Sequence, residues 1–278
     1  PMSMSFARAS FWRTLDWATS CVPMTTDSET SEDAILGGRL RVRQPLRGHR
    51  VGHDAILLAA ATCARATERT IELGAGVGAA AFAIAARAQG MKVTLVEIDP
   101  VLCALARHNA RLNRLEDRVT VFGADAESTE SLKSVGLSAE SFDRVLMNPP
   151  FHDARRHNAS PDPGRRLAHS GEAGLLKRWV DSAAWLLKTN GVLVLIWRAD
   201  ALGDVIETLQ PVFGAIAVLH VHPREDAAPI RVLVRAEKGG GISRKSYPPL
   251  VLNDEAGRPT PVVEAIMRDG KTLPLAED

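Results

Sequence analysis

The sequence predicts an α/β fold of the doubly wound class, built on a mostly parallel sheet. Short apolar runs alternate with helical patterns through the middle of the chain, a glycine-rich turn follows the first run, and an acid ends the second. Strands that alternate with helices indicate βαβ units and a parallel sheet. A glycine-rich turn between a strand and a helix is typical of a nucleotide-type ligand site. With 278 residues, the chain is long enough for one large domain or two small ones.

Composition and charge exclude several classes of protein. Hydrophobic residues make up 45% of the chain and charged residues 24%, which is close to the average for globular proteins that fold in water. No apolar run approaches the ~20 residues that a membrane-spanning helix needs. The three cysteines are far apart and predict neither a disulfide framework nor a zinc site, and we expect no other metal site. A cytoplasmic protein without a membrane partner is therefore expected.

The N-terminal part of the chain is expected to hold a tail and a short extension of the main fold. Residues 1–33 should form a flexible tail, because their Ser/Thr-rich acidic end has neither a helical nor a strand period. The chain starts with proline, and Met24 is a candidate native start. Alternating side chains predict a half-buried strand over residues 37–45. An Ala/Leu-rich pattern predicts a helix over 53–63, with Asp54 capping its first turn.

The middle of the chain contains the repeated strand and helix patterns. Expected strands cover residues 70–73, 92–97, 118–122, 142–147 and 191–197, and expected helices start at Val77, cover 100–112 and include 175–185. Strands at 213–221 and 229–237 are joined by a turn too short for a helix, so they should run antiparallel. Three glycines at 239–241 then break the chain. We expect one domain over residues 34–241 and an appendage over 242–278.

The glycine-rich turn at Gly74, Gly76 and Gly78 is the first candidate ligand site. Glycine lets the backbone turn tightly and approach a ligand closely, and the helix N-terminus that follows offers unpaired amides. Glu97 ends the next strand, where an acid would accept hydrogen bonds from both ribose hydroxyls. These features suit dinucleotides and S-adenosyl-L-methionine alike, and a tight turn also needs glycine for steric reasons alone.

Three further features favour S-adenosyl-L-methionine as the cofactor over a dinucleotide. Glu72 directly precedes the glycines, where its carboxylate would face a ligand amino group, and Asp125 follows the third strand. The glycine spacing is Gly-x-Gly-x-Gly rather than Gly-x-Gly-x-x-Gly. For Asp125, an ordinary surface acid is the alternative interpretation. The predicted cofactor-binding residues are Asp54, Glu72, Gly74, Ala75, Gly76, Gly78, Glu97, Ile98, Asp125, Ala126 and Asn148.

The predicted catalytic turn, Asn148-Pro149-Pro150-Phe151, follows the fourth strand of the series. Ligands of open α/β sheets bind outside the carboxyl ends of the strands, so this turn and the glycine-rich turn should share one crevice. The two prolines fix the backbone and remove two donors, which leaves carbonyls as the main polar groups. Phe151 offers a flat face on which an extruded base can stack. The alternative is that Asn-Pro-Pro merely ends a strand.

This turn suits methylation of a delocalised amino group. The exocyclic amino group of adenine is a poor nucleophile because its lone pair is delocalised into the ring. The side-chain carbonyl of Asn148 and the backbone carbonyl of Pro149 can accept its two hydrogens, which draws the lone pair out of conjugation as the sulfonium offers its methyl in line. Neither a metal nor a covalent intermediate is needed.

Two clusters of arginines predict an RNA partner. The net charge is only +1, so any nucleic-acid contact must come from local clusters. One cluster consists of Arg47, Arg50 and three arginines that should form a solvent-facing row on the strand over 37–45. The other cluster follows the catalytic turn. Phosphate neutralisation needs such side chains beside the crevice, although solvated surface charge is the alternative. The predicted nucleic-acid-binding residues are Arg39, Arg41, Arg43, Arg155, Arg156, Arg165 and Arg166.

At these motifs the sequence resembles the small-domain class I methyltransferases, and more closely the bacterial valine-tRNA adenine-N6 methyltransferase family. The segments that carry the resemblance are residues 38–45, 54–58, 72–78, 96–99, 148–151, 224–225, 231–234 and 248–270. It implies a Rossmann-like, seven-stranded sheet with a reversed final strand, S-adenosyl-L-methionine as methyl donor, and an adenine beside the tRNA anticodon as acceptor. The chain departs from the common pattern in two places: His53 precedes Asp54, and Phe151 takes the place of the usual tyrosine.

Several other functions fit part of the pattern. A protein glutamine N5-methyltransferase would also hold a planar, delocalised nitrogen at an Asn-Pro-Pro turn, and another amino group of RNA or DNA could be the acceptor. An NAD-dependent oxidoreductase would share the glycine-rich turn and Glu97, but the chain has no second domain with an evident acid/base set. A non-catalytic RNA-binding module is the remaining alternative. The sequence therefore predicts an S-adenosyl-L-methionine-dependent transferase acting on adenine N6 in tRNA or another structured RNA.

Overall fold

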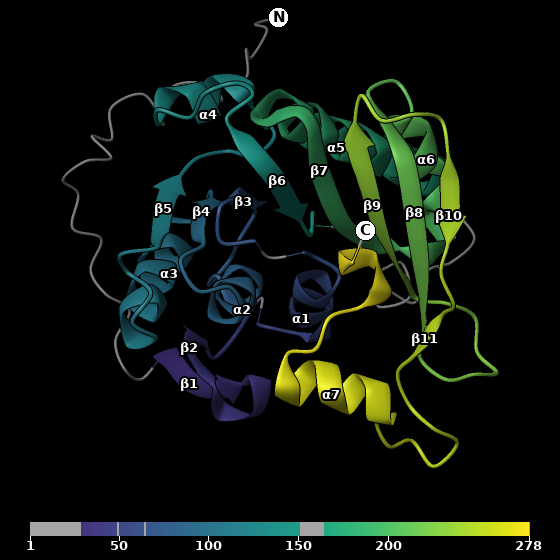
Figure 1. The fold of residues 1–278 in the computed structure, drawn as a ribbon, viewed down its shortest axis with the longest axis horizontal. Helices are drawn as coiled ribbons and strands as arrows, with labels where there is room; N and C mark the ends of the chain where they lie inside the picture. Colours follow the sequence, from purple (N-terminus) through teal and green to yellow (C-terminus); the bar gives the residue numbers. More distant parts are fainter. Residues whose placement is uncertain (1–28, 49, 64, 151–163, 278) are drawn as a thin grey trace, which may run out of the picture.

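The computed structural model describes residues 29–48, 50–63, 65–150 and 164–277, with side chains described from residue 174 onward in the last of these ranges. Phe151, Arg155 and Arg156 lie outside the described residues, as do the side chains of Arg165 and Arg166. The roles expected for these five residues stay predictions. The described residues form a twisted central sheet with helices on both faces and a small hairpin beside one helix layer (Figure 1).

The central sheet contains the seven expected strands in the order β8-β9-β7-β6-β3-β4-β5. These strands are β3 (Arg69–Leu73), β4 (Lys92–Glu97), β5 (Val119–Gly123), β6 (Phe142–Met147), β7 (Leu187–Arg198), β8 (Phe213–His222) and β9 (Arg231–Lys238). β9 pairs antiparallel with β7 and β8, whereas β3, β4, β5, β6 and β7 pair in parallel. The expected mostly parallel sheet with an antiparallel last strand is therefore confirmed.

Six helices cover the two faces of the sheet. Those on one face are α1 (His53–Ala60), α2 (Ala79–Arg87) and α3 (Pro100–Leu112), and those on the other are α4 (Thr129–Ser134), α5 (Gly164–Leu186) and α6 (Leu202–Leu209). Each face has its own hydrophobic core, which is the arrangement expected of strands buried on both sides. The chain passes outward from β3 to β4 and β5 and then returns to the other side of β3 as β6. Strand order reverses there, so a crevice is expected at the carboxyl ends of β3 and β6.

The N-terminal segment corrects one expectation about the tail. Residues of β1 (Thr30–Ile35) pair antiparallel with β2 (Leu40–Pro45), so the end of the predicted tail forms a strand. Its mostly polar residues hide this strand, although its partner β2 follows only a few residues later. Asn109 of α3 accepts a hydrogen bond from the backbone N–H of Arg43 at 2.7 Å and donates one to the Arg43 carbonyl at 2.9 Å. The hairpin is thereby fixed to α3.

The C-terminal segment adds to the main fold. β10 (Arg244–Ser246) and β11 (Leu250–Val251) pair in parallel with β8 and extend the sheet beyond its seven main strands. α7 (Pro261–Asp269) begins at Thr260, whose hydroxyl caps the helix, and ends at Gly270 in the left-handed conformation. Val263 and Ile266 of α7 join the core that contains α1. The segment expected to be an appendage is therefore integrated through both backbone pairing and apolar packing.

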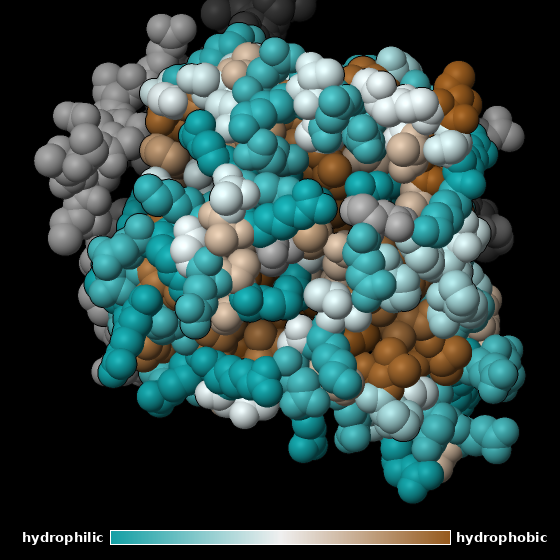
Figure 2. Space-filling view, viewed as in Figure 1, coloured by the Kyte–Doolittle hydropathy of each residue, from teal (hydrophilic) through white to brown (hydrophobic). Residues whose placement is uncertain are grey.

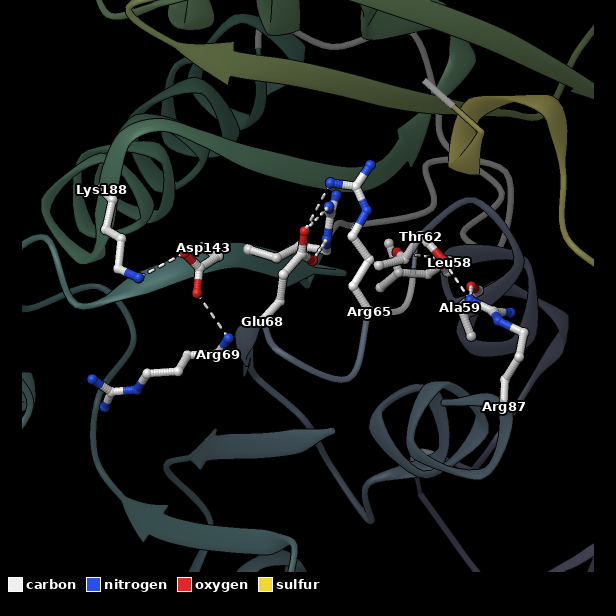
Figure 3. Close-up of polar contacts among 10 residues, drawn as sticks. Leu58, Ala59, Thr62, Arg65, Glu68, Arg69, Arg87, Asp143 and Lys188 are labelled. Atoms are coloured by element: carbon white, nitrogen blue, oxygen red, sulfur yellow. Dashed lines mark hydrogen bonds and ion pairs between the residues drawn. The ribbon is translucent and has the colours of Figure 1, made fainter. Parts of the chain in front are cut away.

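Ion pairs connect the amino ends of neighbouring strands, at the edge of the sheet opposite the crevice (Figure 3). Arg144 in β6 has only 4% of its side chain exposed and binds the Glu68 carboxylate through two hydrogen bonds of 3.0 and 3.2 Å. Asp143 accepts from Lys188 at 2.6 Å and from the backbone N–H of Arg69 at 2.8 Å. A buried arginine needs such a partner because an unpaired buried charge is strongly destabilising.

Polar residues cover most of the face of the molecule seen in Figure 2. Among the described residues, the large hydrophobic side chains that are substantially exposed include Leu46, Ile98 and Val262. No helix within the described part of the chain is long and apolar enough to cross a membrane. Ile98 is the one of these three that lies at the crevice described below.

Candidate functional site

A cleft of about 800 Å³ lies at the carboxyl ends of β3, β4, β5 and β6, at the expected reversal point. This volume is within the range of small-molecule and cofactor sites. The cleft brings together the glycine-rich turn, Glu97 and the Asn148 turn, which the sequence placed in one crevice. Its lining consists of Gly48, Arg50, Gly52, Asp54, Gly74, Gly76, Val96, Glu97, Ile98, Leu102, Ala124, Asp125, Ala126, Glu127, Asn148, Pro149, Pro150, Trp179 and Arg231.

The three glycines of the turn after β3 meet different structural requirements. Gly74, Gly76 and Gly78 all have positive φ, at 64°, 56° and 92°, which glycine adopts without steric cost. A Cβ on Gly74 would lie 2.4 Å from the Trp179 ring, and one on Gly78 would lie 2.6 Å from Phe82. A Cβ on Gly76 would meet nothing within 4 Å. Gly76 therefore leaves open backbone at the cleft, whereas Gly74 and Gly78 are required by packing.

Glu97 joins the glycine turn to the end of β4. Its Oε2 accepts a hydrogen bond from the Gly76 N–H at 2.7 Å, and its Oε1 accepts one from the Asp99 N–H at 2.9 Å. The carboxylate is nearly buried yet lines the cleft. Each carboxylate oxygen has a second lone pair, so both can still accept from a ligand. Two backbone bonds hold this acid in the orientation needed to accept from a pair of hydroxyls.

Glu72 lies behind the glycine turn, outside the cleft lining. Its Oε2 accepts a hydrogen bond from the backbone N–H of Ala81 at 2.9 Å, which satisfies one of the free amides in the first turn of α2. The pKa of Glu72 is raised from 4.5 to about 8, mainly by burial; the Ala81 bond lowers the pKa and the nearby Glu97 carboxylate raises it, and both effects are included in this value. Ala75 and Gly78, also predicted to bind the cofactor, are likewise outside the lining.

Glu72→Gln is expected to raise stability in alkaline solution without changing it in acid. Because the pKa is raised in the folded state, folding takes up a proton between about pH 4.5 and 8, and wild-type stability falls as pH rises through that window. Glutamine keeps an acceptor for Ala81 and removes the titration. Its advantage should grow by up to about 1.4 kcal/mol for each pH unit within the window. Denaturant unfolding from pH 5 to 9 measures this, and parallel curves for the two proteins would contradict it.

Residues after β4 and β5 form one wall of the cleft. Ile98 is 61% exposed, which places an apolar surface beside Glu97 where a base could pack. Asp125 accepts from the Glu127 N–H at 2.8 Å, and Ala126 lies between them. The wall therefore combines apolar contact with carboxylate acceptors, as expected for an adenosine group.

The Asn148 turn carries an unsatisfied acceptor. The Asn148 Oδ1 is buried and has no hydrogen-bond partner among the described residues. Pro149 and Pro150 follow it along the cleft and contribute no backbone donor. Leaving a buried polar atom unpaired costs about 1–3 kcal/mol, so such an atom in a cleft indicates a ligand that completes it. The group that binds here should donate a hydrogen bond.

Asp54 lines the cleft but does not cap α1 as expected. Gly52 is the N-cap residue of α1, and no side chain accepts a hydrogen bond from the free amides at the start of this helix. Asp54 Oδ2 instead accepts from Arg231 Nε at 2.9 Å, which connects α1 to β9 beside the cleft. A charged partner 177 residues away competes successfully with the local capping role.

The three N-terminal arginines predicted to bind nucleic acid contact other parts of this chain. Arg39 precedes β2 and donates to the Asp269 carbonyl at 2.6 Å, Arg41 pairs with Glu32, and Arg43 Nε donates to the Thr30 hydroxyl at 2.9 Å. Arg43 is also half-buried, so the expected solvent-facing row is only partly correct. None of the three lines the cleft.

Arg50, from the same cluster, does line the cleft. It donates from Nη1 to the Pro45 carbonyl at 2.9 Å and from Nη2 to Asp33 Oδ2 at 2.7 Å. Sequence reasoning grouped Arg50 with its neighbours but did not place it at the site, and it missed Trp179 and Arg231 entirely. Arg231 and Trp179 belong to a strand and a helix that reach the cleft only through the tertiary fold, so no local signal identifies them.

Comparison with known proteins gives the family. The profile of the family described as Methyltransferase small domain matches residues 50–224, and the chain therefore belongs to that family. Membership of a methyltransferase family, together with the adenosine-type wall and Glu97, indicates S-adenosyl-L-methionine as the cofactor. The residues present fit it, because Glu97 offers acceptors to ribose and Gly76 leaves the backbone open.

Individual relatives are similar over different lengths. A protein from Porphyromonas gingivalis named tRNA1(Val) (adenine(37)-N6)-methyltransferase is 32% identical to this chain. The matched region covers 56% of this chain and 61% of that protein's length. One of the same name from Shewanella amazonensis is 29% identical over 80% of this chain and 91% of its own. A crystal structure from Agrobacterium tumefaciens, described as a predicted O-methyltransferase, is 30% identical with a TM-score of 0.65, covering 79% of this chain and 97% of that one.

Proposed function

We propose that this chain transfers a methyl group from S-adenosyl-L-methionine to the exocyclic N6 of an adenine in tRNA. The observation that carries the proposal is the buried Asn148 Oδ1, which lacks a partner among the described residues and lies in the same cleft as Gly76 and Glu97. An acceptor at this position suits a nucleophile that has hydrogens to donate. The amino group of adenine has two.

The cofactor would be held by residues on the β3, β4 and β5 side of the cleft. Glu97 would accept from the ribose hydroxyls, and Ile98 and Ala126, which also line the cleft, would contact the cofactor's adenine. Gly76 allows the chain to approach without a side chain between backbone and ligand. When bound, S-adenosyl-L-methionine supplies a methyl group on a positively charged sulfur. Asp54 is within the same lining and is available to the amino-acid end of the cofactor.

The Asn148 turn would activate the acceptor. Asn148 Oδ1 and the Pro149 carbonyl accept hydrogen bonds from the amino group, so that the nitrogen lone pair is directed toward the methyl carbon. The amino nitrogen would take up the methyl group that bound S-adenosyl-L-methionine supplies, and its displaced proton would pass to solvent. The two prolines keep the turn rigid, which holds the acceptors in place before the reaction begins.

An RNA acceptor is supported by the relatives and by charge at the cleft. Two relatives are named tRNA1(Val) (adenine(37)-N6)-methyltransferases. Arg50 and Arg231 line the cleft, and each is held by a carboxylate, Arg50 by Asp33 and Arg231 by Asp54. Arginines fixed in this way are suited to phosphate because the guanidinium fork is already oriented.

Arg50→Gln is expected to weaken tRNA binding by roughly 3- to 10-fold and to reduce its salt dependence by about one phosphate contact. The affinity for S-adenosyl-L-methionine should change little, since the proposed contact is with phosphate. Arg244→Gln is the matched control, because Arg244 is an exposed arginine on β10, near the start of β8 and away from the cleft. Filter binding at several salt concentrations measures both slopes. Equal slopes for Arg50→Gln and wild type would contradict the phosphate contact.

The acceptor class is tested by offering two pools of substrate. The purified protein is incubated with methyl-labelled S-adenosyl-L-methionine and either unmodified total tRNA or cell-extract protein, and each product is digested and identified. The proposal expects label in the tRNA digest. Label on glutamine would instead support protein methylation, which the same Asn-Pro-Pro turn would suit, and label in neither pool would favour a binding module.

A further inference from the structure

Trp179 of α5 carries the second unsatisfied group of the cleft. Its side chain lines the cleft although the residue is only 5% exposed, and its Nε1 has no hydrogen-bond partner among the described residues. A buried indole N–H normally finds an acceptor. Among the fully buried side-chain atoms of the described lining, the unpaired donor is Trp179 Nε1 and the unpaired acceptor is Asn148 Oδ1.

The packing of the Trp179 ring places it beside the Asn148 turn. Its Cη2 occupies the space where a Cβ on Gly74 would lie, at 2.4 Å from that position. Gly74 follows Leu73, and Asn148 follows Met147, and Leu73 and Met147 are paired in the register of β3 and β6. Neighbouring strands lie roughly 4.8 Å apart. The benzene edge of the Trp179 ring therefore lies at the end of β3, beside the strand that leads into the Asn148 turn, and both residues line the same cleft.

We propose that Trp179 Nε1 donates a hydrogen bond to the ring nitrogen adjacent to the amino group that is methylated. Resting on the proposed function, this assigns the Watson–Crick edge of adenine to the cleft, with N6 donating to Asn148 and N1 accepting from Trp179. The edge of guanine or uracil has a ring N–H donor where adenine has a lone pair, and that donor would face Trp179 without an acceptor. Trp179 is thus a specificity residue for a base with an amino group next to an unprotonated ring nitrogen.

Replacing one atom in the RNA tests this contact. The substrates are the tRNA labelled in the acceptor assay, rebuilt with adenosine or with 1-deazaadenosine at the methylated position, the latter having C–H in place of N1. Wild type is expected to lose about 10- to 100-fold in kcat/KM on the 1-deaza RNA. Trp179→Phe should lose a similar factor on the adenosine RNA and show no further loss on the 1-deaza RNA, because the two changes remove the same bond.

Trp185→Phe is the matched control, since Trp185 lies on the same helix but outside the cleft lining. The Lys133 ammonium lies over its ring in a cation–π contact. Trp185→Phe should keep the full penalty for the 1-deaza RNA. Equal turnover of the two RNAs by wild type would overturn the contact even if Trp179→Phe fails to fold, and a penalty that persists in folded Trp179→Phe would do the same. A wild type that methylates no RNA would contradict the proposed function itself.

Discussion

Asn148→Ala is expected to reduce methyl transfer by about 10²- to 10³-fold while leaving the affinity for S-adenosyl-L-methionine within about twofold of wild type. The side-chain oxygen is buried without a partner, so its removal breaks no hydrogen bond with the described residues. The loss should fall on kcat, because the acceptor acts on the amino group as it becomes nucleophilic. Initial rates with tRNA and calorimetry with the cofactor measure the two quantities separately.

A comparable loss of cofactor binding and of transfer would contradict this account of Asn148. It would mean that the turn supports the cleft rather than the reacting group. The melting temperature of Asn148→Ala separates a structural role from a catalytic one, since a large decrease would show that the side chain stabilises the fold although its oxygen has no partner among the described residues.

Gly74→Ala is expected to cost more stability than Gly76→Ala, although both residues have positive φ. The left-handed conformation costs each alanine about 1–2 kcal/mol. Only at residue 74 does the new methyl group also meet a ring, with Trp179 at 2.4 Å, and such overpacking typically costs a further 1–3 kcal/mol. Denaturant unfolding of the two variants measures the difference.

The effects of these two variants on the affinity for S-adenosyl-L-methionine should be separable from their effects on stability. The methyl group at residue 76 would meet no atom within 4 Å beyond its chain neighbours, in a residue that lines the cleft. We expect Gly76→Ala to raise the dissociation constant for S-adenosyl-L-methionine by about tenfold or more. Equal stability of the two variants would contradict the packing role assigned to Gly74, and unchanged affinity in Gly76→Ala would contradict the close approach at Gly76.

Local sequence signals were sufficient for the elements that build the sheet. The strands Lys92–Glu97 and Phe142–Met147 and the helix Pro100–Leu112 have the bounds that the sequence predicts. That helix begins after Asp99, whose carboxylate accepts from the Val101 and Leu102 amides, and has proline in its first turn. Apolar runs and capping residues of this kind act within a few positions, so they can be recognised without the fold.

Other features depend on partners far away in sequence. The polar strand Thr30–Ile35 pairs with the nearby β2, and Asn109 of α3 holds β2 by a hydrogen bond to Arg43, 66 residues away. Asp54 has the position of a capping residue but binds Arg231 of β9 instead. Local patterns reveal neither the contact of Asn109 with Arg43 nor that of Asp54 with Arg231, since the fold brings these distant residues together.

The candidate site was predictable in outline but less so in detail. Strand order places the glycine turn, Glu97 and Asn148 in one cleft, as the motif positions imply. The sequence does not show that Glu72 turns inward to the Ala81 amide. It also does not show that Trp179 fills the space above Gly74, because helix α5 reaches this point only by packing on the sheet.

The most direct test of the central claim is the identity of the methylated nucleoside. Unmodified tRNA is treated with wild type and with Asn148→Ala in the presence of S-adenosyl-L-methionine, digested to nucleosides, and analysed by liquid chromatography with mass spectrometry against standards. The account predicts N6-methyladenosine from wild type and almost none from Asn148→Ala. A 2′-O-methylated nucleoside, or 1-methyladenosine, as the wild-type product would contradict transfer to an exocyclic amino group at the Asn148 turn.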